Sequence, residues 1–64
     1  MINVSPELKV NLKQQRLRQI EAQYYEIKMN KTGFEANGKV EQAAEMENLL
    51  QELERAYQAI SNMD

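Results

Sequence analysis

Apolar residues recur at alternating intervals of three and four through both halves of this 64-residue chain. Such spacing places them on one side of an α-helix and forms the a/d seam through which two helices pack. No segment alternates with the period of two that is typical of a strand, so the pattern predicts an all-α fold. The predicted seam comprises Val10, Lys13, Leu17, Ile20, Tyr24, Ile27, Lys31 and Phe34 in the first half, and Ala36, Ala43, Met46, Leu50, Leu53, Tyr57 and Ile60 in the second.

The start of the first helix is expected at Pro6. The hydroxyl of Ser5 can accept a hydrogen bond from a free backbone N–H of the first turn, and proline fits the first helical position. Glu7 then lies near the positive end of the helix dipole. Residues 1–5 precede this start and are expected to be loose, unless the apolar side chains among them fold back onto the helix.

The break between the helices has two interpretations. In one, Gly33 ends the first helix as its C-terminal cap. In the other, the helix continues to about Ala36 and the dipeptide Asn37-Gly38 forms the turn, because both residues tolerate a positive φ. Residues 38–43 also resemble the turn between the two helices of a tetratricopeptide repeat, which implies a helix–turn–helix here, although no 34-residue repeat is present.

Packing register favours the second interpretation. A turn near residues 37–38 stacks apolar positions along the seam and leaves Lys31 against Met46 as the one mixed layer. A turn centred on Glu35 instead sets Lys13 on Tyr57 and Lys31 on Val40, which makes two mixed layers. We therefore expect an antiparallel, coiled-coil-like two-helix hairpin that forms one domain over residues 1–64. Its first helix spans about residues 6–36, its turn about residues 37–38 and its second helix about residues 39–62.

The hairpin is expected to leave apolar surface uncovered. A monomer of this size buries only about 60% of the surface that its unfolded chain exposes. The second helix has flanking apolar residues at Val40, Leu49, Ala56 and Met63, and residues 6–16 project beyond its end in the favoured register. We therefore expect two hairpins to dimerise into a four-helix bundle. The side chains expected to contact a partner are Leu8, Leu12, Tyr25, Leu49 and Met63.

The absence of cysteine and histidine excludes several chemistries. A chain without them has no disulfide, no thiol nucleophile, no imidazole base and no zinc or haem ligand set. Glu41, Glu45 and Glu52 share one helix face, but that face lies opposite the apolar seam and is expected to be solvated. We predict no catalytic, cofactor-binding or metal-binding residues and do not expect an enzyme.

The two halves of the chain carry opposite net charges. Residues 1–31 hold six basic and three acidic residues, whereas residues 32–64 hold two basic and seven acidic ones. This asymmetry suits two helices that lie side by side. The basic residues near the start offer an alternative function, namely a small dimeric nucleic-acid-associated regulator. That alternative basic patch consists of Lys9, Lys13, Arg16 and Arg18.

The sequence thus predicts a non-catalytic protein–protein interaction or assembly module, such as a small adaptor, inhibitor or structural subunit. The expected partners are a second copy of the chain, another protein, or both. The chain contains no apolar run long enough for a signal sequence or a membrane span, so no membrane association is expected and a cytoplasmic location is the default.

Overall fold

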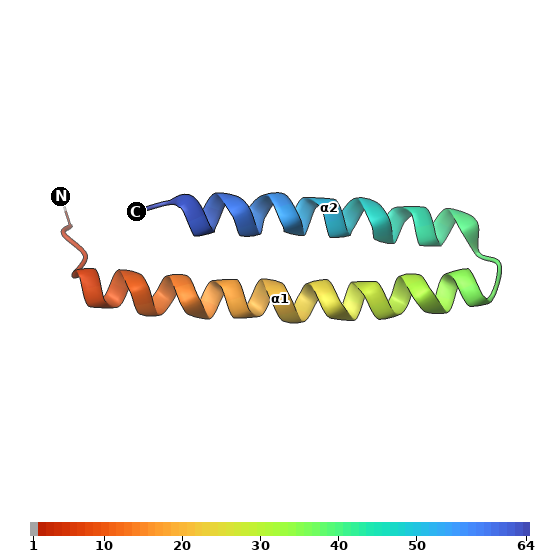
Figure 1. The fold of residues 1–64 in the computed structure, drawn as a ribbon, viewed down its shortest axis with the longest axis horizontal. Helices are drawn as coiled ribbons and strands as arrows, with labels where there is room; N and C mark the ends of the chain where they lie inside the picture. Colours follow the sequence, from red (N-terminus) through yellow and green to blue (C-terminus); the bar gives the residue numbers. More distant parts are fainter. Residues whose placement is uncertain (1) are drawn as a thin grey trace.

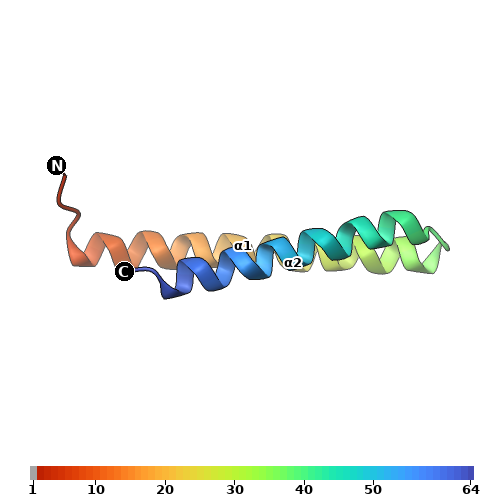
Figure 2. The ribbon, with the colours of Figure 1, turned by 90° about the horizontal axis from the view of Figure 1, so that it is seen from above.

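The computed structural model describes residues 2–64, which form the helices α1 (Pro6–Ala36) and α2 (Val40–Asn62). The helices lie antiparallel, side by side, in a rod of 51 × 16 × 15 Å (Figure 1). We call the end with both chain termini the open end and the end with the turn the closed end. Figure 2 shows the helices crossing at a shallow angle, as helices with a heptad seam do. Residues 2–64 contain no strand, so the predicted all-α antiparallel hairpin is confirmed.

The N-terminus of α1 is capped by Ser5. Its backbone is extended, and its side-chain oxygen accepts a hydrogen bond from the backbone N–H of Leu8 at 3.2 Å. Pro6 occupies the first turn, where its missing N–H costs no helical hydrogen bond. Residues 2–4 precede the cap without regular secondary structure. Met1, which belongs to the segment expected to be loose, lies outside the described residues.

The turn lies at Asn37–Lys39, and Gly33 lies inside α1. Gly38 has a φ of 69°, a conformation that glycine adopts without steric cost. Its N–H donates to the Glu35 carbonyl at 3.1 Å, and the Lys39 N–H donates to the Phe34 carbonyl at 2.9 Å. These two bonds form a Schellman cap, which satisfies carbonyl groups that the end of α1 would otherwise leave free. The structure therefore adopts the turn that the packing register favours.

Hydrogen bonds between the helices establish the register. Tyr24 donates to Glu54 at 2.8 Å, and Tyr57 donates to Glu21 at 3.2 Å. Nearer the closed end, the Lys31 amine donates to a Glu47 carboxylate oxygen at 2.9 Å. In all three pairs, the α1 residue lies opposite nearly the same part of α2 that a turn at residues 37–38 predicts. A turn centred on Glu35 would shift these partners by about two helical turns.

The core is small. Ile20, Ala43 and Leu50 are the buried hydrophobic residues of the described chain, and each of them keeps 5–6% of its surface exposed. Most other seam residues are half-buried between the helices. The two ends of the predicted seam, Val10 and Ala36, are exposed, contrary to the pattern. Val10 lies beyond the end of α2 and has no helix opposite it. Ala36 belongs to α1 rather than to the second helix, and it lies two residues after Phe34, which places it off the α1 seam.

The hairpin exposes more surface than a compact protein of its mass. Its accessible area is 5405 Å² for a chain of 7.5 kDa. A compact folded monomer of that mass exposes about 4,250 Å². The excess of about 1,150 Å² exceeds the roughly 800 Å² that each partner buries in a standard protein–protein interface. The isolated hairpin is therefore an incompletely buried structure.

Candidate interaction surface

Large apolar side chains are exposed mainly at the open end. Ten such side chains are exposed in residues 2–64, and six of them lie at this end. Those on α1 lie in its first turns, which extend beyond the end of α2 (Figure 1). Leu12 and Met63 keep 52% and 59% of their surfaces exposed. The set, which we call the open-end patch, comprises Ile2, Val4, Leu8, Val10, Leu12 and Met63.

A groove crosses the open-end patch between α1 and the last residues of the chain. Val4, Leu12, Ile60 and Met63 contribute its apolar lining. The amine of Lys13 donates to the backbone carbonyl of Met63 at 2.9 Å, which joins the residues after α2 to the first helix. We call this feature the open-end groove. Its cationic lining consists of Lys9, Lys13 and Arg16.

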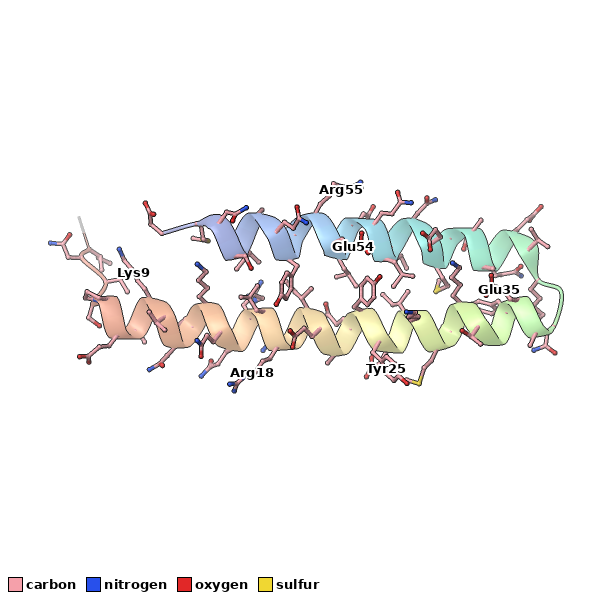
Figure 3. The ribbon with its side chains drawn as sticks, in the orientation of Figure 1. Lys9, Arg18, Tyr25, Glu35, Glu54 and Arg55 are labelled. Carbon is pink, nitrogen blue, oxygen red and sulfur yellow. The ribbon has the colours of Figure 1, made fainter. Side chains whose placement is uncertain are left out.

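The predicted basic patch is therefore assembled in part. Lys9, Lys13 and Arg16 line one groove. Arg18 does not line it and projects from the side of α1 that faces away from α2 (Figure 3). The Lys13 amine already donates a hydrogen bond to the backbone carbonyl of Met63. The four basic residues thus do not form one continuous cationic surface on a single hairpin.

A second groove, the tyrosine groove, lies near the middle of the hairpin on its opposite side. Ile20 and Leu53 contribute its apolar lining. At its edges, Tyr24 and Glu54 form one hydrogen-bonded pair between the helices, and Tyr57 and Glu21 form the other. The full lining is Ile20, Glu21, Tyr24, Tyr25, Leu53, Glu54, Tyr57 and Gln58.

Both hydrogen-bonded phenols are harder to ionise than ordinary tyrosines. The hydrogen bond to Glu54 is the main cause that raises the pKa of Tyr24, with partial burial and the negative charge of Glu54 adding to it. The hydrogen bond to Glu21 likewise raises the pKa of Tyr57, aided by the charge of that carboxylate. A phenolate would lose the hydrogen bond and would be repelled by the adjacent carboxylate. Both tyrosines are therefore held as neutral donors.

The sequence interpretation placed both tyrosines on the seam but missed these pairs. A signal for them exists, because Glu21-x-x-Tyr24 and Glu54-x-x-Tyr57 repeat the same spacing in the two helices. When such helices pack antiparallel at this register, each glutamate comes beside the tyrosine of the other helix. The repeated motif is informative only once the register is known.

The ion pair between Lys31 and Glu47 occupies the mixed layer expected at Lys31. The Lys31 Nζ and Glu47 Oε2 atoms lie 2.9 Å apart, and the Lys31 and Glu47 side chains are 29% and 44% exposed, respectively. Their hydrogen bond is the main cause that raises the pKa of Lys31 and lowers that of Glu47. The pair places an acidic residue of α2 beside a lysine that the seam pattern sets among apolar residues.

The five predicted partner contacts are all exposed, but they do not form one patch. Leu12 and Met63 line the open-end groove, and Leu8 lies one turn before Leu12. Leu49 lies two heptads before Met63, on the same side of α2. Tyr25 lines the tyrosine groove on the opposite side, with 64% of its surface exposed, and points away from α2 (Figure 3).

The carboxylates singled out in the sequence are solvent-exposed. Glu41, Glu45 and Glu52 all lie on the outside of α2. No group of three or more potential ligand residues within residues 2–64 is arranged to hold a metal ion. Over the same residues, neither helix combines the length and apolarity needed to cross a membrane.

Comparison with known proteins identified no relative of this chain: no family model, no curated protein and no solved structure matches it.

Proposed function

We propose that this protein is a non-catalytic assembly module that associates with a second copy of itself through a surface that includes apolar residues of its open end. The observation that carries the proposal is the open-end patch, where six large apolar side chains are exposed at the same end of the hairpin and three of them, Val4, Leu12 and Met63, line one groove. A partner that covers this patch would gain the free energy of apolar burial, about 25 cal/mol for each Å² removed from water.

The small core supports the same function. Three side chains are buried within the hairpin, and none of the described side chains is completely enclosed. Two helices of this kind have little stability of their own, because the entropy lost on folding nearly balances such limited burial. Pairing of two hairpins into a four-helix bundle provides the missing burial.

Sedimentation equilibrium over a wide range of protein concentration tests the proposal. We expect the purified chain to reach twice its monomer mass of 7.5 kDa. Leu12→Glu combined with Met63→Glu should shift the equilibrium towards monomer, because both substitutions place charges in the contact. A chain that stays monomeric at every concentration would contradict the proposed function.

Val40→Glu is the matched control for that experiment. Val40 is 76% exposed, but it lies at the closed end, away from the open-end patch. Its substitution adds one glutamate to an exposed apolar position, as each of the two changes in the test variant does, and should leave the dimer unchanged. Equal weakening by the control would show that added negative charge, rather than lost apolar contact, disrupts the association.

The alternative function, nucleic-acid binding, is supported by the convergence of Lys9, Lys13 and Arg16 on one groove. It is weakened by Arg18, which projects elsewhere (Figure 3), and by the net charge of −2. We expect no binding of random-sequence duplex DNA at physiological salt. Binding that falls steeply with rising salt would favour the alternative, since each phosphate contact releases counterions.

A further inference from the structure

One side of the hairpin is more apolar than the other outside the seam. Lys9, Leu12 and Arg16 of α1 and Met63, the C-cap residue of α2, line the open-end groove and mark this side. Residues at seven-residue steps from them lie on the same side, which we call the groove side. So do the residues four positions before Met63 and before its seven-residue equivalents, just as Leu12 lies four positions before Arg16. Its apolar residues outside the seam are Leu12, Leu49, Ala56, Ala59 and Met63. The corresponding residues of the opposite side are Tyr25, Val40 and Ala44.

Three apolar residues of the groove side, Leu49 and Ala56 of α2 and its cap Met63, are symmetrically arranged. Leu49 and Met63 each lie one heptad from Ala56. If a second α2 packs antiparallel against the first with the two Ala56 residues facing each other, Leu49 of each copy meets Met63 of the other. The small side chain of Ala56 permits close approach of the helices at the centre of such a pair.

The charges of the groove side are separated along the rod. Towards the open end the basic residues Lys9, Lys13 and Arg16 outnumber Asp64, which lines the same groove, whereas Glu26, Glu45 and Glu52 lie towards the middle and the closed end. None of these charges forms an ion pair within residues 2–64. Two copies side by side in the same direction would bring like charges to the same levels. Two copies in opposite directions bring the basic end of each beside the acidic stretch of the other.

We propose that two copies pair through their groove sides in opposite directions, about a two-fold axis that passes beside Gln23 and Ala56. The inference rests on the proposed self-association and adds the face, the direction and the centre of the contact. In this arrangement α1 packs on the partner's α1, and α2 packs on the partner's α2. Arg16 then lies within about one helical turn of Glu26 in the partner, since Gln23 is at the axis. The excess surface of about 1,150 Å² on each hairpin is sufficient for an interface of this kind.

Site-directed cross-linking tests the arrangement, because the chain has no cysteine and each introduced thiol is unique. Gln23→Cys, Gln42→Cys and Gln58→Cys replace exposed glutamines. A short bis-maleimide should link two Gln23→Cys chains efficiently, because both thiols lie beside the axis. Gln58→Cys is the control on the opposite side of the hairpin and should not be linked.

Gln42→Cys distinguishes the two directions. Gln42 lies near the closed end, so in the proposed dimer the two thiols are at opposite ends of a rod 51 Å long and cannot be linked. In a dimer of the same direction the two thiols share one level. Efficient linking of Gln42→Cys, or none of Gln23→Cys, would overturn the proposed arrangement.

Charge reversal provides an independent test. Arg16→Glu should raise the dissociation constant of the dimer about tenfold at low salt, because it replaces two attractions by two repulsions across the two-fold axis. Adding Glu26→Arg to the same chain should restore the affinity. Failure of this rescue would contradict the proximity of these two residues.

The outcomes separate the arrangement from the proposed function. A monomer in sedimentation equilibrium, with no cross-linking at any site, would overturn both. A dimer in which Gln23→Cys is not linked, or in which Gln58→Cys is linked instead, would leave self-association intact and reject the groove side as the contact.

Discussion

At the residue scale, the two tyrosine–glutamate pairs predict how stability depends on alkaline pH. The pKa values of Tyr24 and Tyr57 are raised in the folded hairpin above their ordinary value of 10.0. Their contribution to stability is therefore complete below pH 10 and is lost as the pH rises through the folded pKa values. Circular dichroism melts should show a falling midpoint above about pH 10.

The variant Tyr24→Phe combined with Tyr57→Phe should flatten part of this alkaline decrease, because it removes both phenols that titrate against carboxylates. Tyr25→Phe is the control, since the Tyr25 hydroxyl makes no hydrogen bond within residues 2–64. An unchanged alkaline limb in the double variant would show that the pairs do not form in solution.

The Lys31–Glu47 ion pair makes a second prediction, for acidic pH. The pKa of Glu47 is lowered from 4.5 in the folded state, so its contribution is present above that value and is lost as the pH falls through the folded pKa. Glu47→Gln should therefore reduce the loss of stability between about pH 5 and pH 3. The comparison requires melts of both proteins over this range, with Glu41→Gln as an exposed control outside the pair.

At the scale of the elements, the two glycines predict opposite effects of the same substitution. Gly38→Ala should cost about 1–2 kcal/mol, because an alanine at φ 69° pays the penalty of the left-handed region. Gly33→Ala should instead stabilise the hairpin by about 0.5–1 kcal/mol, because Gly33 lies in the helical interior and its added Cβ meets nothing within 4 Å. Urea denaturation of both variants measures the difference, and a loss at Gly33 would refute a continuous α1.

The seam predicts a large difference between buried and exposed apolar residues. Leu50 is 5% exposed, so Leu50→Ala should cost about 2–5 kcal/mol, which is enough to unfold a marginal domain. Met29 is half-exposed on α1, and Met29→Ala should change the stability by less than about 0.5 kcal/mol. Helicity measured by circular dichroism separates the two outcomes. Full retention of helicity in Leu50→Ala would mean that the seam is not what holds the helices together.

At the scale of the whole molecule, folding and association should be linked. If the dimer supplies burial that the hairpin lacks, the melting midpoint must rise with protein concentration, because mass action favours the associated state. Melts recorded at several concentrations test this linkage. A midpoint that does not change with concentration, in a chain that still folds, would show that a single hairpin is stable without a partner.

Much of the fold was predictable because the signals are local. The Ser5-Pro6-Glu7 sequence specifies a helix start through a cap, a fixed φ and the helix dipole, and the three–four spacing specifies which side of each helix packs. The exposure of the five contact candidates was also predictable, since each lies off the seam or beyond the end of α2. Their grouping into patches was not predictable, because Tyr25 and Leu12 lie on opposite sides of the hairpin.

The sequence by itself determined two helices, their packing faces and an excess of apolar surface, since these properties depend on residue types at short spacings. Only the tertiary structure decided between the turns at Gly33 and at Gly38, because both glycines can cap a helix locally and the choice depends on which side chains meet across the seam. The same register brought Met63 to Leu12 and each tyrosine to a glutamate of the other helix. Contacts between residues far apart in the chain exist only after the helices have packed. The proposed interaction surface depends on such contacts.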